Sequence, residues 1–385
     1  MDRSQFDASP AGHLVPTTHG QWAFVPYDLP PVFDSAAILS CLVSATQALG
    51  ELNGILRTLP DPYILIQPLQ AREALASSSM EGTYTTVDAL LLAEAGYGGS
   101  AESGDTRDVM NYAVALRNAV GSLAEIPLSL RTIRGAHRDL LHGVTRARGA
   151  AIEPGEFKKH QNWIGAASLE AARFVPAPPK EAYDALCRLE LYAQRQDREA
   201  TPPLVDAALI HYQFEAIHPF ADGNGRVGRI LIPVALFDRK ALLHPALFLS
   251  PVLERRKDEY IDRMFEVSRA GDWEGWLGFF MSVVEESCRE TIAIADRLFL
   301  LRERYRKTLQ SAGRSALLLS IVDRLFTRPV FSIPQLAEYL GVTYPAAQKN
   351  LETVLALGIV EEVPETAHPK FFAAREIMNT ITGQS

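Results

Sequence analysis

The chain of 385 residues is long enough for two or three domains, and its 47% hydrophobic and 22% charged residues are typical of a soluble globular protein. A formal net charge of −8 argues against a protein that mainly binds nucleic acid or an anionic membrane surface, because such proteins usually carry a basic face. The polar residues 1–20 hold no apolar stretch of signal-peptide length and no uncharged apolar run of 18 residues follows, so we expect a cytoplasmic protein without a membrane partner.

Apolar residues at three- and four-residue intervals predict an almost entirely helical chain. The predicted helices cover residues 34–54, 68–80, 86–95, 108–123, 130–141, 180–196, 204–216, 230–241, 255–269 and 273–311. Residues 1–27 are rich in Ser, Pro, Gly and His, and we expect them to be only partly ordered. The predicted fold class is therefore all-α.

One segment between the helices departs from this pattern. Two short strand-like runs, separated by residues 166–173, predict a small β-hairpin. The hairpin would pair Asn162, Trp163, Ile164 and Gly165 with Phe174 and Val175. Considered alone, the same residues fit an irregular loop equally well, because short runs carry little information.

Residues 312–385 form a further predicted unit, which follows a change in composition near Ser311. Predicted helices at 315–326, 333–340 and 344–357, with predicted strands at 360–363 and 370–373, have the order of a winged helix-turn-helix. That motif usually indicates DNA binding. However, residues 314–375 carry six basic and six acidic side chains, and phosphate contacts dominate DNA affinity, so a structural or protein-binding role has at least equal support.

The run from His218 to Arg229, His-Pro-Phe-Ala-Asp-Gly-Asn-Gly-Arg-Val-Gly-Arg, predicts a phosphate-binding turn before a helix. Gly223, Asn224 and Gly225 tolerate the positive φ angles that direct successive backbone N–H groups toward one point. At the start of a helix, such groups bind anions. Without the rest of the run, these three residues fit an ordinary glycine-rich turn equally well.

Four side chains in the same run have the chemistry of phosphoryl transfer. His218 is the natural general base, and Asp222 is a hard oxygen ligand of the kind that Mg²⁺ takes beside substrate phosphates. Arg226 and Arg229 are three residues apart on the first helical turn, so both can face a bound anion.

The whole run matches the Fic family signature, His-x-Phe-x-Asp/Glu-Gly-Asn-Gly-Arg-x-x-Arg, at every specified position. The chain therefore resembles Fic-type AMP transferases. This resemblance implies a helical core in which a β-hairpin flap, at the position of the hairpin predicted above, lies over the active site and pairs with an extended segment of a target protein.

A second motif, Ser77-Ser78-Ser79-Met80-Glu81-Gly82, closes one of the predicted helices. On its own it fits a solvated helix end. Together with the signature it resembles the Fic inhibitory motif, Ser/Thr-x-x-x-Glu-Gly/Asn, with Ser77, Glu81 and Gly82 at the defining positions. The resemblance implies that a helical N-terminal segment, residues 1–105, inhibits a catalytic core, residues 106–311, within the same chain.

The resemblance also implies an activity, that of a protein adenylyltransferase (AMPylator) that uses ATP and Mg²⁺. AMP would move to a Tyr, Thr or Ser hydroxyl of a target protein or of the chain itself, with His218 as the base, Asp222 on the metal, and Arg226 and Arg229 on the β- and γ-phosphates. Residues 223–225 and the Asn224 side chain would stabilise charge on the phosphoryl oxygens.

Two alternative functions are left open by the sequence. One is a winged-helix regulatory or adaptor protein with a non-catalytic, nucleotide-binding Fic core, and the other is an enzyme that mainly removes AMP. DNA is the less favoured partner of the C-terminal unit, and the sequence leaves homodimer formation open.

Overall fold

Helices make up most of the structure, a computed structural model that describes residues 1–18, 20–59, 61–98, 104–144, 153–165, 168–311, 316–364, 366 and 368–383. Up to residue 311 the helices are α1 (Leu39–Thr58), α2 (Tyr63–Ser79), α3 (Val87–Glu94), α4 (Gly104–Ser122), α5 (Leu130–Leu140), α6 (Pro179–Ala193), α7 (Pro203–Ile217), α8 (Asn224–Asp238), α9 (Ser250–Arg255), α10 (Lys257–Ala270) and α11 (Trp273–Ser311). The predicted all-α class is confirmed.

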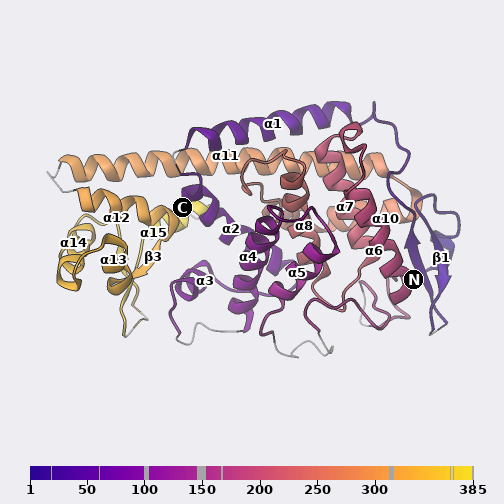
Figure 1. Cartoon of the computed structure of the whole chain (residues 1–385), viewed down its shortest axis with the longest axis horizontal. Helices are drawn as coiled ribbons and strands as arrows, with labels where there is room; N and C mark the ends of the chain where they lie inside the picture. The colour runs from indigo at the N-terminus through magenta and orange to yellow at the C-terminus, as the bar shows by residue number, and fades with distance from the viewer. Residues whose placement is uncertain are drawn as a thin grey trace.

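Two helices that follow each other in sequence, α7 and α8, pack against each other among the other helices (Figure 1). Both are buried on nearly every side, so their apolar residues form no single stripe. Helices α4 and α5 pack against α8, and the Trp276 indole of α11 donates a hydrogen bond to the Ala208 carbonyl of α7 at 3.1 Å. The loop between α7 and α8, which carries the glycine-rich run, is therefore fixed at both ends by the core.

The N-terminal residues form a β-hairpin, so the expectation that residues 1–27 are only partly ordered is wrong. Strands β1 (Gly12–Pro16) and β2 (Trp22–Pro26) pair antiparallel, and the backbone N–H of Phe24 donates to the Val175 carbonyl at 2.8 Å. The Phe24 ring packs on Phe6 and Phe174. Strand β2 is buried along most of its length, and it therefore lacks the alternation of polar and apolar residues that reveals a half-buried strand.

The C-terminal elements follow the predicted order with two additions. They are α12 (Ala316–Thr327), β3 (Val330–Ser332), α13 (Ile333–Leu340), α14 (Tyr344–Ala356), β4 (Glu361–Glu362), β5 (Phe371–Ala373) and α15 (Arg375–Thr382). The strands form an antiparallel sheet in the order β3-β5-β4. Strand β3 and helix α15 were not predicted, and the winged-helix assignment of this C-terminal module (residues 316–383) stays a prediction.

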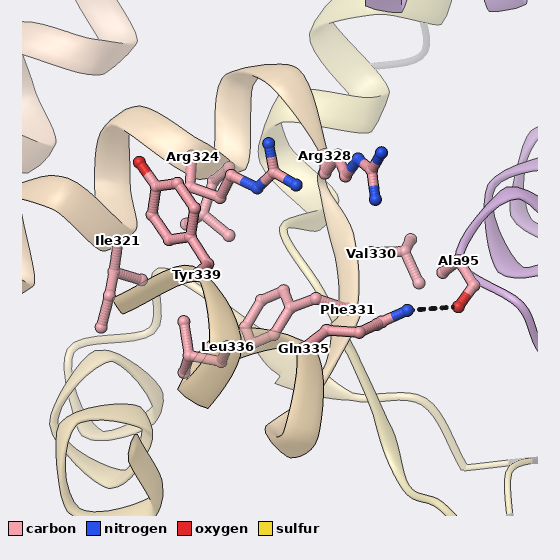
Figure 2. Close-up of a pocket in the computed structure, with 10 residues that line it drawn as sticks. Ala95, Ile321, Arg324, Arg328, Val330, Phe331, Gln335, Leu336 and Tyr339 are labelled. Carbon is pink, nitrogen blue, oxygen red and sulfur yellow. Dashed lines mark hydrogen bonds between the residues drawn. The ribbon is translucent and has the colours of Figure 1, made fainter. Parts of the chain in front are cut away.

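The C-terminal module contacts both α3 and the distal half of α11. Gln335 Nε2 donates to the Ala95 carbonyl at 2.7 Å, beside a small hollow that Figure 2 shows between α12, α13 and the end of α3. Tyr305 of α11 donates to Glu376 of α15 at 3.0 Å. Helix α1 lies along α11, and α2 packs on α4 and α9 (Figure 1). The described part of residues 1–105 therefore shares its hydrophobic core with the segment that follows. The predicted domain boundaries at residues 105 and 312 stay predictions.

A buried carboxyl group joins α2 to the rest of the core. Glu73 is 3% exposed and accepts hydrogen bonds from Tyr112 Oη of α4 at 2.8 Å and from the Ser250 backbone N–H of α9 at 2.9 Å. Burial raises the pKa of Glu73, and its donors partly offset that effect. This carboxyl group fixes the helix that carries the second motif.

Glu73→Ala is expected to destabilise the fold by about 3 kcal/mol, because three buried donors, the Tyr112 hydroxyl and the Ser250 N–H and hydroxyl, would lose their acceptor and a cavity would remain. Chemical denaturation would measure the change. Arg72→Ala is the matched control: Arg72 pairs with Glu290 at a partly exposed site, and its loss should cost under about 1 kcal/mol. Equal costs for the two variants would contradict the role given to Glu73.

Candidate active site

The loop between α7 and α8 adopts left-handed backbone angles at both ends. His218 ends α7 with φ 50°, and Gly223 precedes the first residue of α8 with φ 77°. A positive φ is uncommon for any residue other than glycine and persists only where the surroundings fix it, often at functional sites. The backbone strain therefore lies at the residue predicted to be the base.

Asn224 closes this loop from inside. Its Oδ1 accepts from the Phe220 backbone N–H at 2.8 Å, and its Nδ2 donates to the Phe220 carbonyl at 2.9 Å. The Asn224 side chain was expected to bind the phosphoryl oxygens, whereas in the structure that buried amide is bound to the loop. What faces the mouth of the site is the N-terminus of α8, whose first N–H groups have no acceptor within the helix.

Arg229 and the motif at residues 77–82 are in direct contact. Arg229 Nε donates to Ser77 Oγ at 2.8 Å, and Nη2 donates to the Ser77 carbonyl and to Glu81 Oε1, each at 2.8 Å. Burial acts to raise the pKa of Glu81, but the Arg229 guanidinium outweighs it, and the net pKa is lowered. Glu81 is therefore a carboxylate at neutral pH, bound to the arginine that was predicted to hold phosphate.

Gly225 makes the approach of Glu81 to α8 feasible. A Cβ atom at this position would lie 2.3 Å from Glu81 Oε1 and 3.0 Å from Arg229 Nη1. Any larger residue would displace the glutamate. Gly82, at φ 79°, lets the chain turn away directly after Glu81.

The His218 imidazole is neutral at pH 7. Burial lowers the pKa of His218 to about 4, and the nearby Lys158 ammonium contributes in the same direction. Nδ1 lies 3.3 Å from the Glu215 carbonyl oxygen, which can only accept, so Nδ1 carries the proton and Nε2 keeps its lone pair. A neutral imidazole with Nε2 available is the state that a general base requires.

Three polar residues around the loop were missed by the sequence analysis. His137 of α5 stacks on Phe220 with ring centroids 3.7 Å apart, accepts from the Gly155 backbone N–H at 2.8 Å, and lies 3.1 Å from the Asp222 carbonyl. Lys158 and Glu215, described below, are the other two. No local sequence signal marks His137 or Lys158, because each has partners that are distant in the sequence. Glu215 is close to His218 in the sequence, but its position beside the imidazole depends on the shape of the folded loop.

Glu215 is a buried carboxyl group on the same wall as His218. Burial raises the pKa of Glu215 to about 8, and Oε2 lies 3.9 Å from His218 Nδ1. Within the described part of the chain, Oε1 has no hydrogen-bond partner. It lies where Gly228 leaves space, since a Cβ there would come within 2.0 Å of it.

A cleft of about 480 Å³ brings these groups together, a volume within the range of small-molecule binding sites. Glu81, His218, Gly225 and Arg229 line one side of it. Helix α10 contributes further lining residues, with the apolar and aromatic side chains of Tyr260, Ile261, Met264 and Phe265. The cleft therefore joins a polar end suited to phosphates to an apolar end suited to a planar base.

The flap segment (residues 158–165 and 168–176) is less regular than predicted. Its two runs pair at one bridge, where the Ile164 N–H donates to the Phe174 carbonyl at 2.9 Å, in place of a longer hairpin. Ile164, Gly165 and Phe174 line the cleft, and Trp163 is 40% exposed. Val175 is fully buried, because β2 occupies the adjacent edge, so it is not available to a target.

Asp222 is suited to a metal ion that is bound mainly by other ligands. Its side chain is 27% exposed, Oδ1 accepts from the Gly223 N–H at 2.6 Å, and Arg226 Nη2 lies 3.8 Å away. The described residues contain no cluster of three or more His, Cys, Asp or Glu side chains that could hold a metal. One carboxylate beside a phosphate-binding turn fits Mg²⁺, which binds through one or two carboxylates together with substrate phosphates and water.

The helical arrangement is that of Fic proteins. A Fic family protein from Desulfovibrio desulfuricans G20 is similar over 90% of this chain and 98% of its own, with a TM-score of 0.59 at 19% identity. Fic-1 (residues 134–508) from C. elegans is similar over 68% of this chain and 75% of its own, with a TM-score of 0.54 at 18% identity. At these identities the likeness shows the fold alone.

The chain belongs to the Fic/DOC family. The model of the Fic/DOC family N-terminal region matches residues 39–121, and the Fic/DOC family model matches residues 127–236. Curated relatives named protein adenylyltransferase Fic, from Drosophila virilis and Drosophila melanogaster, are 25% and 24% identical over 181 residues, 47% of this chain. The match spans about a third of the length of those relatives, 33% in each case.

In the described part of the structure, none of the helices has the length and apolar character that crossing a membrane requires.

Proposed function

We propose that the protein is a protein adenylyltransferase that moves AMP from ATP to a Tyr, Thr or Ser hydroxyl of a target protein, and that Glu81 restrains it. One observation carries this proposal: a neutral imidazole, a helix N-terminus and the Glu81–Arg229 pair face the same cleft. The curated relatives that bear the name adenylyltransferase support it.

The proposed reaction is a single displacement at phosphorus. His218 Nε2 takes the proton of the target hydroxyl, and the oxygen forms a bond to the α-phosphorus of ATP. The bond from that phosphorus to the β-phosphate oxygen breaks, and pyrophosphate leaves with the electron pair. The products are an AMP-modified side chain and pyrophosphate.

The remaining residues would bind and orient the nucleotide. The N–H groups at the start of α8 would face developing charge on the phosphoryl oxygens, and Arg229, which lines the cleft, would be a cation for the outer phosphates. Arg226 is buried beside Asp222 and does not line the cleft, so its proposed role at the outer phosphates would need a change in its position. Asp222 would hold Mg²⁺, which neutralises phosphate charge when bound. The apolar wall of α10 is suited to the adenine ring, and the exposed edge of the flap near Gly165 is suited to an extended target segment.

The restraint follows from a competition for Arg229. Its guanidinium binds Glu81 and Ser77 in the structure, and the same donors would be needed for the γ-phosphate. A carboxylate and a phosphate cannot both occupy that position. We therefore expect weak transfer by the unmodified protein and faster transfer once Glu81 is removed.

Mass spectrometry of the purified protein after incubation with Mg-ATP tests the class of reaction. A mass increase equal to one AMP group, absent in the His218→Ala variant, is the expected result, since the chain itself offers many hydroxyl groups. Incubation of Glu81→Gly with labelled ATP and a cell lysate extends the test to other targets. Absence of label on every protein in both experiments would contradict the proposal and favour a non-catalytic adaptor.

The C-terminal module is expected to bind protein and not to bind DNA specifically. Helix α14, which would enter the major groove, carries one cation, Lys349, within one turn of Glu352. Arg324 and Arg328 line the hollow beside α3 (Figure 2). Fluorescence anisotropy with random and selected duplexes at physiological salt is the measurement, and specific binding tighter than about 1 μM would refute this expectation.

A further inference from the structure

Lys158, at the start of the flap segment, is a buried lysine. Its residue surface is 6% exposed, and Nζ donates to Asn162 Oδ1 at 2.7 Å and to the Ile217 carbonyl at 3.4 Å. Throughout the described residues, no carboxylate lies within ion-pair distance of it. The Ile217 carbonyl is at the C-terminus of α7, where the helix dipole attracts a cation. Removing an ammonium group from water without a carboxylate partner is costly, which suggests a functional role.

Lys158 and Asn162 together hold the backbone of the segment that carries His218. The carbonyl oxygens of Ile217, His218, Pro219 and Phe220 accept in turn from Lys158 Nζ at 3.4 Å, Asn162 Nδ2 at 3.1 Å, the Lys158 backbone N–H at 2.8 Å and Asn162 Nδ2 at 2.9 Å. Four consecutive carbonyls thus accept from two flap residues. The segment includes the left-handed His218, a conformation that needs such fixation.

Lys158 also acts on His218 through its charge. Burial and then Lys158 lower the pKa of His218, while the Glu215 carbonyl, Glu81 and Asp222 face the ring and act in the opposite direction. A nearby cation disfavours the imidazolium form. Burial lowers the pKa of Lys158 itself to about 7, so its charge is present on the acid side of neutrality, where His218 would otherwise gain a proton.

We propose that Lys158 is a positioning residue for AMP transfer. It holds residues 217–220 in the conformation that presents the imidazole to a target hydroxyl, and its charge keeps that imidazole free to accept a proton. The inference rests on the proposed function. It also links two steps, because the flap that would align the target and the base that would take its proton share one set of hydrogen bonds.

The test compares pH–rate profiles of AMP transfer in full-length protein carrying Glu81→Gly, with and without a further change at Lys158. Lys158→Met is expected to lower kcat roughly ten-fold or more and to move the acid limb to higher pH by about one unit, since a cation beside the base is lost. Lys158→Arg keeps the positive charge, and the acid limb of its pH–rate profile should stay at the same pH. Lys159→Met is the matched control: Lys159 is exposed, pairs with Glu153 at 2.6 Å, and should change neither quantity.

Each outcome decides the proposal. An unchanged kcat and limb in Lys158→Met would overturn it, and so would a lower kcat with an unmoved limb, which is what a packing role alone would give. If thermal unfolding shows that Lys158→Met does not fold, Lys158→Gln replaces it, because glutamine also removes the charge; the same shift of the acid limb to higher pH supports the proposal, and an unmoved limb refutes it.

The failure of the proposed function would have a different signature. A Glu81→Gly protein that folds but transfers no AMP at any pH counts against adenylyltransferase activity and not against Lys158. In that case NMR titration of His218, in Glu81→Gly with and without Lys158→Met, still measures the charge effect. A higher pKa of His218 after loss of the lysine supports the inference, and equal values overturn it.

Discussion

Glu81→Gly is expected to raise AMP incorporation roughly ten- to a hundred-fold, the range that follows if the Glu81–Arg229 bond contributes about 1.5–3 kcal/mol and each decade of rate corresponds to about 1.4 kcal/mol. Arg229 Nη2 lies 2.8 Å from Glu81 Oε1, and this donor becomes available to the γ-phosphate when the carboxylate is removed. The two hydrogen bonds from Arg229 to Ser77 remain, so the guanidinium keeps its orientation. The gain should therefore appear without a general loosening of the site.

Incorporation of labelled ATP by the wild type and by Glu81→Gly is the measurement, with Glu81→Gly/His218→Ala as the blank. Glu254→Gln is a matched control, because Glu254 contacts Ser79 at the end of the same helix but not Arg229. It should leave transfer nearly unchanged. Equal incorporation by the wild type and Glu81→Gly would mean that residues 77–82 are only a helix end. If the protein also removes AMP, that activity should fall in Glu81→Gly, since a carboxylate facing the cleft can activate water.

His218→Ala is expected to lower AMP transfer by roughly a hundred-fold or more while ATP binding and folding are retained. The phosphate-binding groups belong to α8 and do not depend on the imidazole, and the four carbonyls of residues 217–220 keep their donors. Labelled-ATP incorporation and isothermal titration with ATP would separate the two effects.

The control for this variant is His160→Ala, which removes an exposed histidine of the flap segment. It should retain both transfer and binding. Near-normal turnover by His218→Ala with a protein acceptor would show that another group takes the proton, and Glu215 would then be the nearest candidate.

The sequence predicted those parts of the fold that depend on local pattern. The helix at residues 273–311 begins and ends where predicted, because a long uninterrupted periodicity leaves few alternatives. Helix α2 begins at Tyr63, five residues before Pro68, which was expected to start it. Proline favours a first turn but is tolerated further along where tertiary packing compensates for the missing donor.

From the residues themselves, the candidate site was predictable only where its members are contiguous; Glu81, 148 residues away from Arg229, entered through the family resemblance. The run at residues 218–229 contains the proposed base, the proposed metal-binding carboxylate and both arginines, so the hypothesis about its chemistry came directly from the sequence. His137 and Lys158 act on that run from other elements, and their roles depend on contacts that only folding creates. The N-terminal hairpin was missed for a related reason: β2 is buried on both faces, between β1 and the flap segment, and its apolar run resembles a piece of helix.

Helix α11 gives the molecule a fixed span. Its 39 residues correspond to about 58 Å at a rise of about 1.5 Å per residue. The N-terminal part packs on α7 and the distal part holds the C-terminal module through Tyr305 and its neighbours. A partner protein bound by the C-terminal module would be held at a fixed distance from His218. The partner's hydroxyl groups would therefore reach the active site at high effective concentration only if they lie at that distance from the module. The length of α11 would then determine which part of a bound partner protein is modified.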